Sequence, residues 1–159
     1  MSFQISGLPV APFAHFFGLS DAELAKHAIV RHTADKSPGF PCRVSLRDAE
    51  PGETLLLLNY EHLGVASPYR SSYAIYVREY AEAAHVAVNE VPDVLRRRLL
   101  SLRAFDKRGM LLNADVADGR EIAPLIERML ESREVEYLHV HNAKPGCFAA
   151  RVDRAWKTE

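Results

Sequence analysis

A chain of 159 residues, 48% of them apolar, is long enough to bury one hydrophobic core and falls within the size range of one domain. Its net charge of −1 argues against a protein whose main partner is a nucleic acid. No apolar run approaches the roughly 20 residues of a membrane span, and residues 1–13 lack a secretory pattern, so we expect a cytoplasmic protein with reduced cysteines and no membrane partner.

The N-terminal part of the chain predicts two short strands and one short helix. Phe3–Ser6 and Ile29–Thr33 are the two expected strands. Ser20–Glu23 has the form of a capping box, in which the serine oxygen and the glutamate carboxylate bind backbone N–H groups. A helix of about two turns should follow it. Ala34–Pro41 contains Pro38-Gly39 and is expected to be a loop.

The middle of the chain alternates between expected strands and turns. Cys42–Leu46 alternates apolar and polar residues, which is the pattern of a half-buried strand. Thr54–Asn59 is nearly all leucine and suits a central strand that is covered on both faces. Ser71–Glu79 predicts a longer strand, and His85–Val88 predicts a weaker one.

The C-terminal part predicts a hairpin, a helix and a second hairpin. Pro92–Arg98 should form a helical turn that leads into a hairpin with strands at Leu99–Phe105 and Met110–Val116. The last two expected strands are Val135–His141 and Cys147–Asp153, joined by residues 142–146. Between the hairpins, apolar side chains recur at helical spacing, at Ile122, Leu125, Ile126, Met129 and Leu130.

These elements together predict the α+β fold class. Expected strands outnumber helices by about three to one, which favours a mainly antiparallel sheet with helices packed on it. The amphipathic helix should span about residues 120–131, and the short N-terminal helix should also pack on the sheet. No linker or repeat divides the chain, so we expect a single domain over residues 1–159.

The last hairpin carries the first candidate site. His139 and His141 must share one face of a strand because side chains alternate. If the loop is the five residues 142–146, Cys147 stands opposite His141 with Cβ atoms about 4.5 to 5.5 Å apart. These three residues could then form a reactive thiol site or hold a divalent metal ion. With a four-residue loop, Cys147 would turn to the other face of the hairpin. The alternative to a functional site is that Cys147 is a small buried residue and that the two histidines are partly exposed polar residues.

A polar cluster at the end of the leucine-rich strand is the second candidate site. Asn59, Glu61 and His62 follow the buried residues, and binding residues often lie where strands end. Glu61, His62 and Arg43 are therefore candidates to support Cys147, His139 and His141. The alternative is that these polar residues only terminate the strand. Glu61 and His62 are adjacent, so an extended chain directs them to opposite sides.

Arginine is the third signal, because 15 of the 20 basic residues are arginines. The guanidinium group binds carboxylate and phosphate through paired hydrogen bonds, so the excess of arginine could reflect anion binding. Codon usage in a GC-rich genome is the alternative explanation for this excess. Arg43, Arg47, Arg70 and Arg151 could hold a small anionic ligand or an acidic partner. The run Arg96–Arg98 and its basic neighbours lack interleaved aromatic residues, and we interpret them as a solvated face.

Several segments resemble one bacterial family, the domain of unknown function 1203. They are Pro41–Glu53, Leu57–His62, Pro68–Ser72, Ser101–Asp106 and Leu138–Cys147. Together they cover most of the chain from about Pro41 to Arg154. The resemblance implies a stand-alone bacterial domain of about this size, and it implies no activity, substrate or catalytic residue.

Two function classes remain open from the sequence. The first is a small-molecule enzyme or metal-binding protein that uses the Cys147, His139 and His141 face. The second is a non-catalytic module that binds an anionic ligand through arginines. The chain lacks GxGxxG, Walker, HExxH and GxSxG patterns, so nucleotide folds and common hydrolases find no support. An exposed sheet edge would allow a homodimer.

Overall fold

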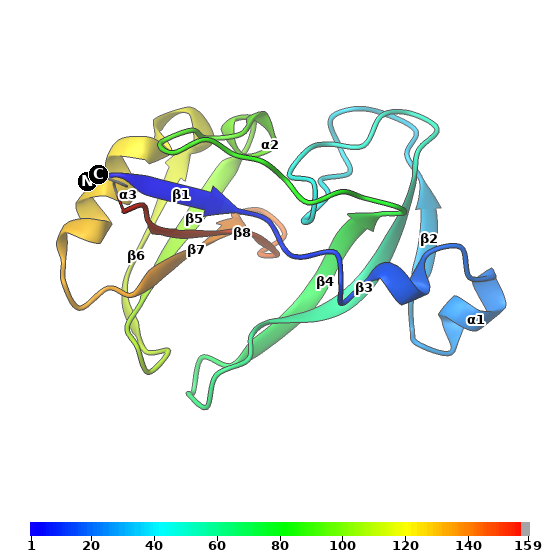
Figure 1. The fold of residues 1–159 in the computed structure, drawn as a ribbon, viewed down its shortest axis with the longest axis horizontal. Coiled ribbons are helices and arrows are strands. Elements are labelled where there is room, and N and C mark those ends of the chain that lie inside the picture. The colour runs from blue at the N-terminus through cyan, green and yellow to red at the C-terminus, as the bar shows by residue number, and fades with distance from the viewer. Residues whose placement is uncertain (157–159) are drawn as a thin grey trace.

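The computed structural model describes residues 1–156 as two antiparallel sheets that lie side by side (Figure 1). The larger sheet has the strand order β1-β8-β7-β5-β6, and the smaller sheet has the order β2-β3-β4. The strands are β1 (Phe3–Ser6), β2 (Val30–Thr33), β3 (Thr54–Leu63), β4 (Ser71–Arg78), β5 (Leu99–Phe105), β6 (Leu111–Asp118), β7 (Tyr137–Asn142) and β8 (Phe148–Arg154). The helices are α1 (Asp21–Ala25), α2 (Asp93–Arg96) and α3 (Ile122–Glu131), with 3-10 turns η1 (Ala14–Phe16) and η2 (Gly119–Glu121).

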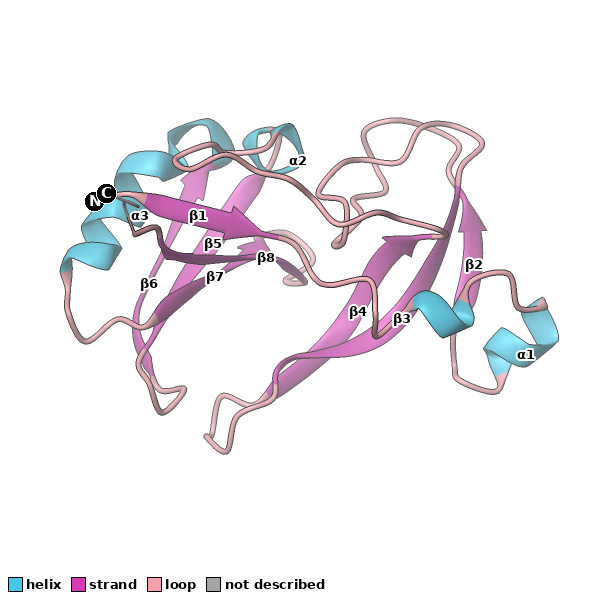
Figure 2. Ribbon diagram, viewed as in Figure 1, coloured by secondary structure: helices cyan, strands magenta, loops and turns pink. Residues whose placement is uncertain are grey.

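Helix α3 covers one face of the larger sheet (Figure 2). Its five predicted apolar residues are all buried, because their helical spacing places them on one stripe. They share a core with Leu100 and Leu102 of β5 and with Leu138 and Val140 of β7. The alternate residues of β7, His139 and His141, must then face away from α3, toward the smaller sheet.

The smaller sheet buries its far face under the N-terminal segment. Leu56 and Leu58 of β3 pack with Phe13 and with Leu24 of α1. The capping box forms as predicted, since Ser20 accepts a hydrogen bond from the Glu23 backbone and Glu23 accepts one from the Ser20 backbone. On the other face, Leu55 packs against Ala34 and Ala49, and Leu57 lines a cavity that faces the larger sheet.

The two sheets contact each other through aromatic and polar side chains. Leu63 of β3 packs with Phe105 and Tyr137 of the larger sheet. The ring of His62 stacks on Phe148, with centroids 5.6 Å apart. Because β7 lies in the middle of the larger sheet and is covered on both faces, all six of its residues are buried.

The α+β fold class and the antiparallel pairing are confirmed, and three details of the prediction are wrong. The chain forms two sheets where one was expected. Residues 43–45 form a turn in place of the expected strand, and Cys42 makes only an isolated bridge to Tyr76. The alternation does not hold, since Arg43 is buried like its apolar neighbours and Leu46 has a φ of 50°. Residues 85–88 form no strand, and the Val86 carbonyl instead accepts a hydrogen bond from the Gln4 side chain.

Three further features bear on the expected site and partners. Strand β3 continues to Leu63, so Glu61 and His62 lie within the strand and not beyond its end. Strand β6 forms one edge of the larger sheet and exposes Leu112 and Val116, while the expected homodimer stays a prediction. Within residues 1–156, no helix has the length and apolar character needed to cross a membrane.

Candidate functional site

The register of the last hairpin separates the predicted cysteine from the predicted histidines. Phe148, and not Cys147, pairs with His141, because a bulge follows Val140 in the β7–β8 ladder. Phe148 therefore shares the face of His141, and residues 142–147 form the connection between them. Because side chains alternate along a strand, Cys147 points to the face opposite the histidines. The expectation that sulfur and imidazoles share one face is wrong.

The metal hypothesis loses its geometric basis for the same reason. Among residues 1–156, no three His, Cys, Asp or Glu side chains are arranged to hold a metal ion. The set His139, His141 and Cys147 is divided between two pockets. Catalytic roles for these three residues stay predictions.

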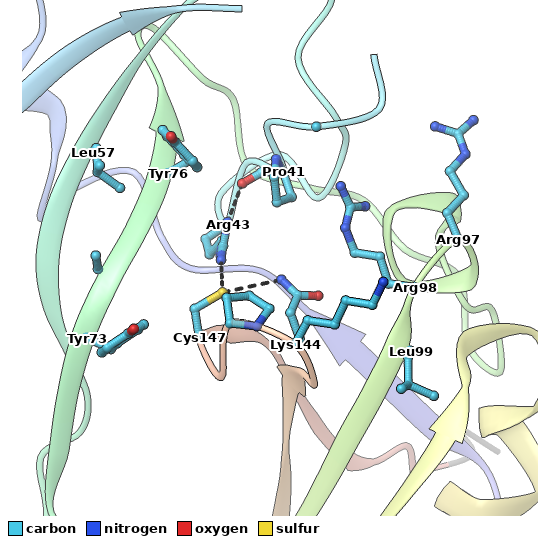
Figure 3. A pocket seen from close by; sticks show the side chains of 14 residues that line it. Pro41, Arg43, Leu57, Tyr73, Tyr76, Arg97, Arg98, Leu99, Lys144 and Cys147 are labelled. Atoms are coloured by element: carbon cyan, nitrogen blue, oxygen red, sulfur yellow. Dashed lines mark hydrogen bonds between the residues drawn. The ribbon is translucent and has the colours of Figure 1, made fainter. Parts of the chain in front are cut away.

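Cys147 lies in a cavity of about 490 Å³ between the two sheets, which we call the Cys147 pocket. Figure 3 shows Arg43 beside Cys147, tyrosines of β4 on one side, and Arg97, Arg98 and Lys144 on the other. The apolar part of the lining consists of Leu57, Tyr73, Ala74, Tyr76, Leu99, Pro41 and Pro145. The pocket therefore joins an apolar wall to a cationic one.

Arg43 is a buried cation without a carboxylate partner among the described residues. Only 3% of the residue is exposed, and its guanidinium donates to the Phe148 carbonyl at 2.7 Å and the Pro41 carbonyl at 2.6 Å. Its third bond runs from Nη2 to the Cys147 Sγ, at 2.9 Å. Burial lowers the pKa of Arg43, and the sulfur of Cys147 offsets part of that effect. A buried cation is costly without a negative partner, so a negative sulfur or a bound anion would stabilise it.

Asn142 completes the surroundings of the sulfur. Its Nδ2 donates to the Cys147 Sγ at 3.5 Å, while its Oδ1 is buried and has no hydrogen-bond partner among the described residues. Only 6% of Asn142 is exposed, and the residue lines the Cys147 pocket. An unpaired buried amide oxygen is costly, and a donor on a ligand would satisfy it.

The cationic wall is only partly neutralised. Asp48, whose side chain is almost fully buried, forms two bonds to Arg98, at 2.6 and 3.1 Å. The same carboxylate lies 3.6 Å from Arg97, which is half exposed. Lys144 makes no ion pair with a described residue and lines the pocket opposite the tyrosines. Asp48 thus contacts two of the three cations at this wall, and the surplus charge is positive.

The histidines form a second, smaller cavity of about 150 Å³, the three-histidine pocket. His62 joins His139 and His141 there, with ring centroids 5.0 to 6.3 Å apart, and all three rings contact Phe148. Burial is the main cause that lowers the pKa of His139 to about 3 and that of His141 to about 4. Both imidazoles are therefore neutral near pH 7.

The remaining predicted residues lie outside both pockets. Glu61 pairs with Arg70 at 3.0 Å on the surface and lines neither pocket, so the structure does not bring it to Cys147. Arg47 binds Glu53 at 2.9 Å, and Arg151 binds Asp153 at 2.9 Å. Of the four arginines expected to hold an anion, only Arg43 lines one of these two pockets.

Sequence reasoning missed several lining residues. Arg97 and Arg98 belong to the run that we interpreted as solvated, yet Arg98 is mostly buried against Asp48. Arg103, from the same group, lines the three-histidine pocket. The only available signal was alternation along β5, which puts Arg103 on the face opposite Leu102. Lys144 and Asn142 belong to the expected loop, and nothing in their spacing marked them.

Comparison with known proteins gives one informative result. No curated protein and no solved structure matches the chain. A family model does match residues 39–154, a span that contains every ionisable residue lining the two pockets. The resemblance seen in the sequence is therefore confirmed, and the chain belongs to the family described as protein of unknown function DUF1203.

Proposed function

We propose that this chain binds a small anionic molecule with an apolar body in the Cys147 pocket. The observation that carries the proposal is Arg43, a guanidinium with 3% exposure and no carboxylate partner among the described residues, bonded to the sulfur in the pocket. An anionic ligand would supply the missing negative charge. This is the second of the two function classes, with Arg43 as its central arginine.

The size and lining of the pocket agree with such a ligand. Small-molecule sites commonly have volumes of about 300–1,000 Å³ and combine apolar walls with a few convergent polar groups. Here the tyrosines Tyr73 and Tyr76 offer the apolar wall, and Arg97 and Lys144 offer the surplus charge. The unpaired Asn142 oxygen adds one acceptor for an N–H or O–H group.

A second candidate function is thiol chemistry on the bound molecule. Arg43 and Asn142 both donate hydrogen bonds to the Cys147 sulfur, which lines the same pocket as the proposed ligand and could attack an electrophile bound there. His139 and His141, which the sequence predicts on the same reactive face as Cys147, lie on the opposite face of the hairpin. An enzyme of this kind would rely on Arg43 in their place.

Calorimetric titration with phenyl phosphate and benzoate tests the binding proposal. Lys144→Gln and Arg97→Gln should each weaken binding by about tenfold, because each removes one charged contact. Arg108→Gln is the matched control, since Arg108 is an exposed arginine outside the pocket. Saturating ligand should also raise the free energy of unfolding, by about 2.7 kcal/mol at 100 times Kd. Equal affinity in all variants, or no binding by either compound, would contradict the proposal.

A further inference from the structure

The three-histidine pocket contains polar groups that the proposed function does not use. Nδ1 of His62 and Nδ1 of His139 are buried and have no hydrogen-bond partner among the described residues. Only 3% of His139 is exposed, and it lines the cavity with His141 and Arg103. Buried polar groups are normally paired, so two unpaired imidazole nitrogens at one cavity point to a missing ligand.

The hydrogen bonding of His141 fixes which of its nitrogens can accept a proton. Its Nδ1 lies 2.9 Å from the carbonyl oxygen of Gly146, and a carbonyl can only accept. Nδ1 therefore carries the hydrogen. Since burial keeps the ring neutral, Nε2 carries a lone pair and acts as an acceptor. A ligand at this nitrogen must bring its own O–H or N–H group.

Arg103 supplies a positive charge next to these rings. It stands directly opposite His139 in the β5–β7 ladder, and Ser101 stands opposite His141, so these side chains share one face. The guanidinium donates to the Ser101 hydroxyl at 3.3 Å and forms no ion pair with a described carboxylate. Its charge is among the causes that lower the pKa of all three histidines. The pocket therefore has a positive potential and no acidic residue in its lining.

These features favour an anion over a metal cation. No three donor side chains in residues 1–156 are arranged around a metal position, and a cation would lie beside an uncompensated guanidinium. Ser71, whose hydroxyl lies 2.9 Å from Nε2 of His62, adds a further polar group to the lining. A cavity of about 150 Å³ limits the ligand to a few heavy atoms.

We infer that the three-histidine pocket binds a small protonated oxyanion, of the class of hydrogen phosphate and bicarbonate. The O–H group of the anion donates to Nε2 of His141, and its charged oxygens face Arg103. A fully deprotonated oxyanion such as sulfate lacks the hydrogen that Nε2 of His141 requires, and it should bind more weakly. This site is separate from the Cys147 pocket and does not depend on the function proposed for it.

Calorimetric titration of the full chain with inorganic phosphate and with sulfate, near neutral pH, tests the inference. Phosphate should bind, and sulfate should bind at least about tenfold more weakly, because one hydrogen bond to the site is lost. His141→Asn keeps a donor near Gly146 but removes the Nε2 acceptor, and Arg103→Gln removes the charge. Each substitution should weaken phosphate binding by about tenfold or more. Arg108→Gln, at an exposed arginine outside both pockets, is the matched control and should leave phosphate affinity unchanged.

Imidazole nitrogen NMR of the unsubstituted chain tests the same inference without any substitution, so it applies even if a variant fails to fold. Phosphate should shift the Nε2 resonance of His141, and sulfate should not. Equal binding of the two anions, loss of phosphate binding in Arg108→Gln, or no response at His141 would each overturn the inference. Stoichiometric binding of Zn²⁺ alone, with shifts at all three histidines, would also overturn it and would identify a metal site.

Discussion

At the scale of single residues, the contact between Arg43 and Cys147 should control the reactivity of the thiol. The guanidinium donates to the sulfur at 2.9 Å, and hydrogen bonds to a charged group are worth about 1.5–3 kcal/mol. Arg43→Gln should therefore slow alkylation of Cys147 by iodoacetamide by about tenfold or more near neutral pH, and Arg43→Lys should slow it less. Mass spectrometry of the modified peptide gives the rate, with Cys147→Ser showing the background from Cys42. An unchanged rate in Arg43→Gln would show that the thiol reacts independently of the arginine.

At the scale of elements, local patterns were predictable and long-range contacts were not. The capping box at Ser20 and the strand Leu99–Phe105 depend on neighbouring residues, and both formed as the sequence predicted. Arg43 was placed on a strand because its segment alternates, but its side chain is held by Phe148, which is 105 positions away. The face of Cys147 depended on one bulged residue that no local pattern marks. The histidines were identified correctly as neighbours, whereas their third member, His62, joined them only through the packing of two sheets.

Helix α3 is the element whose contribution to stability can be tested most directly. Ile126 is fully buried against the larger sheet, and Ile126→Ala should lower the free energy of unfolding by about 2–5 kcal/mol, because it leaves a cavity in the core. Glu127 follows it on the exposed face of the same helix, so Glu127→Ala should change stability by about 0.5 kcal/mol or less. Urea unfolding measures both values. Similar losses in the two variants would mean that α3 does not pack as described.

At the scale of the whole molecule, the two sheets enclose a layer of neutral histidines, and this should make stability depend on pH. The pKa values of His139 and His141 fall from 6.5 to about 3 and about 4 on folding, chiefly through burial. Below about pH 6.5 the unfolded chain therefore binds more protons at these histidines than the folded chain does. Their contribution to the free energy of unfolding is full above about pH 6.5 and decreases as the pH falls. Glu53 and Glu79, whose ion pairs lower their pKa from 4.5 to about 2, add to the loss only below about pH 4.5.

The interval between about pH 6.5 and 4.5 thus isolates the histidines, and the free energy of unfolding should fall there by a few kcal/mol. His139→Leu removes one titrating group and should make the dependence shallower, as measured by urea unfolding across this interval. His85→Asn is the matched control, because His85 is an exposed histidine far along the chain from the inter-sheet layer. If stability were constant down to pH 4.5, or if both variants kept the original slope, the histidines would not be sealed between the sheets. The three-histidine pocket would then be open to solvent, and a bound anion would not be needed to balance the charge of Arg103.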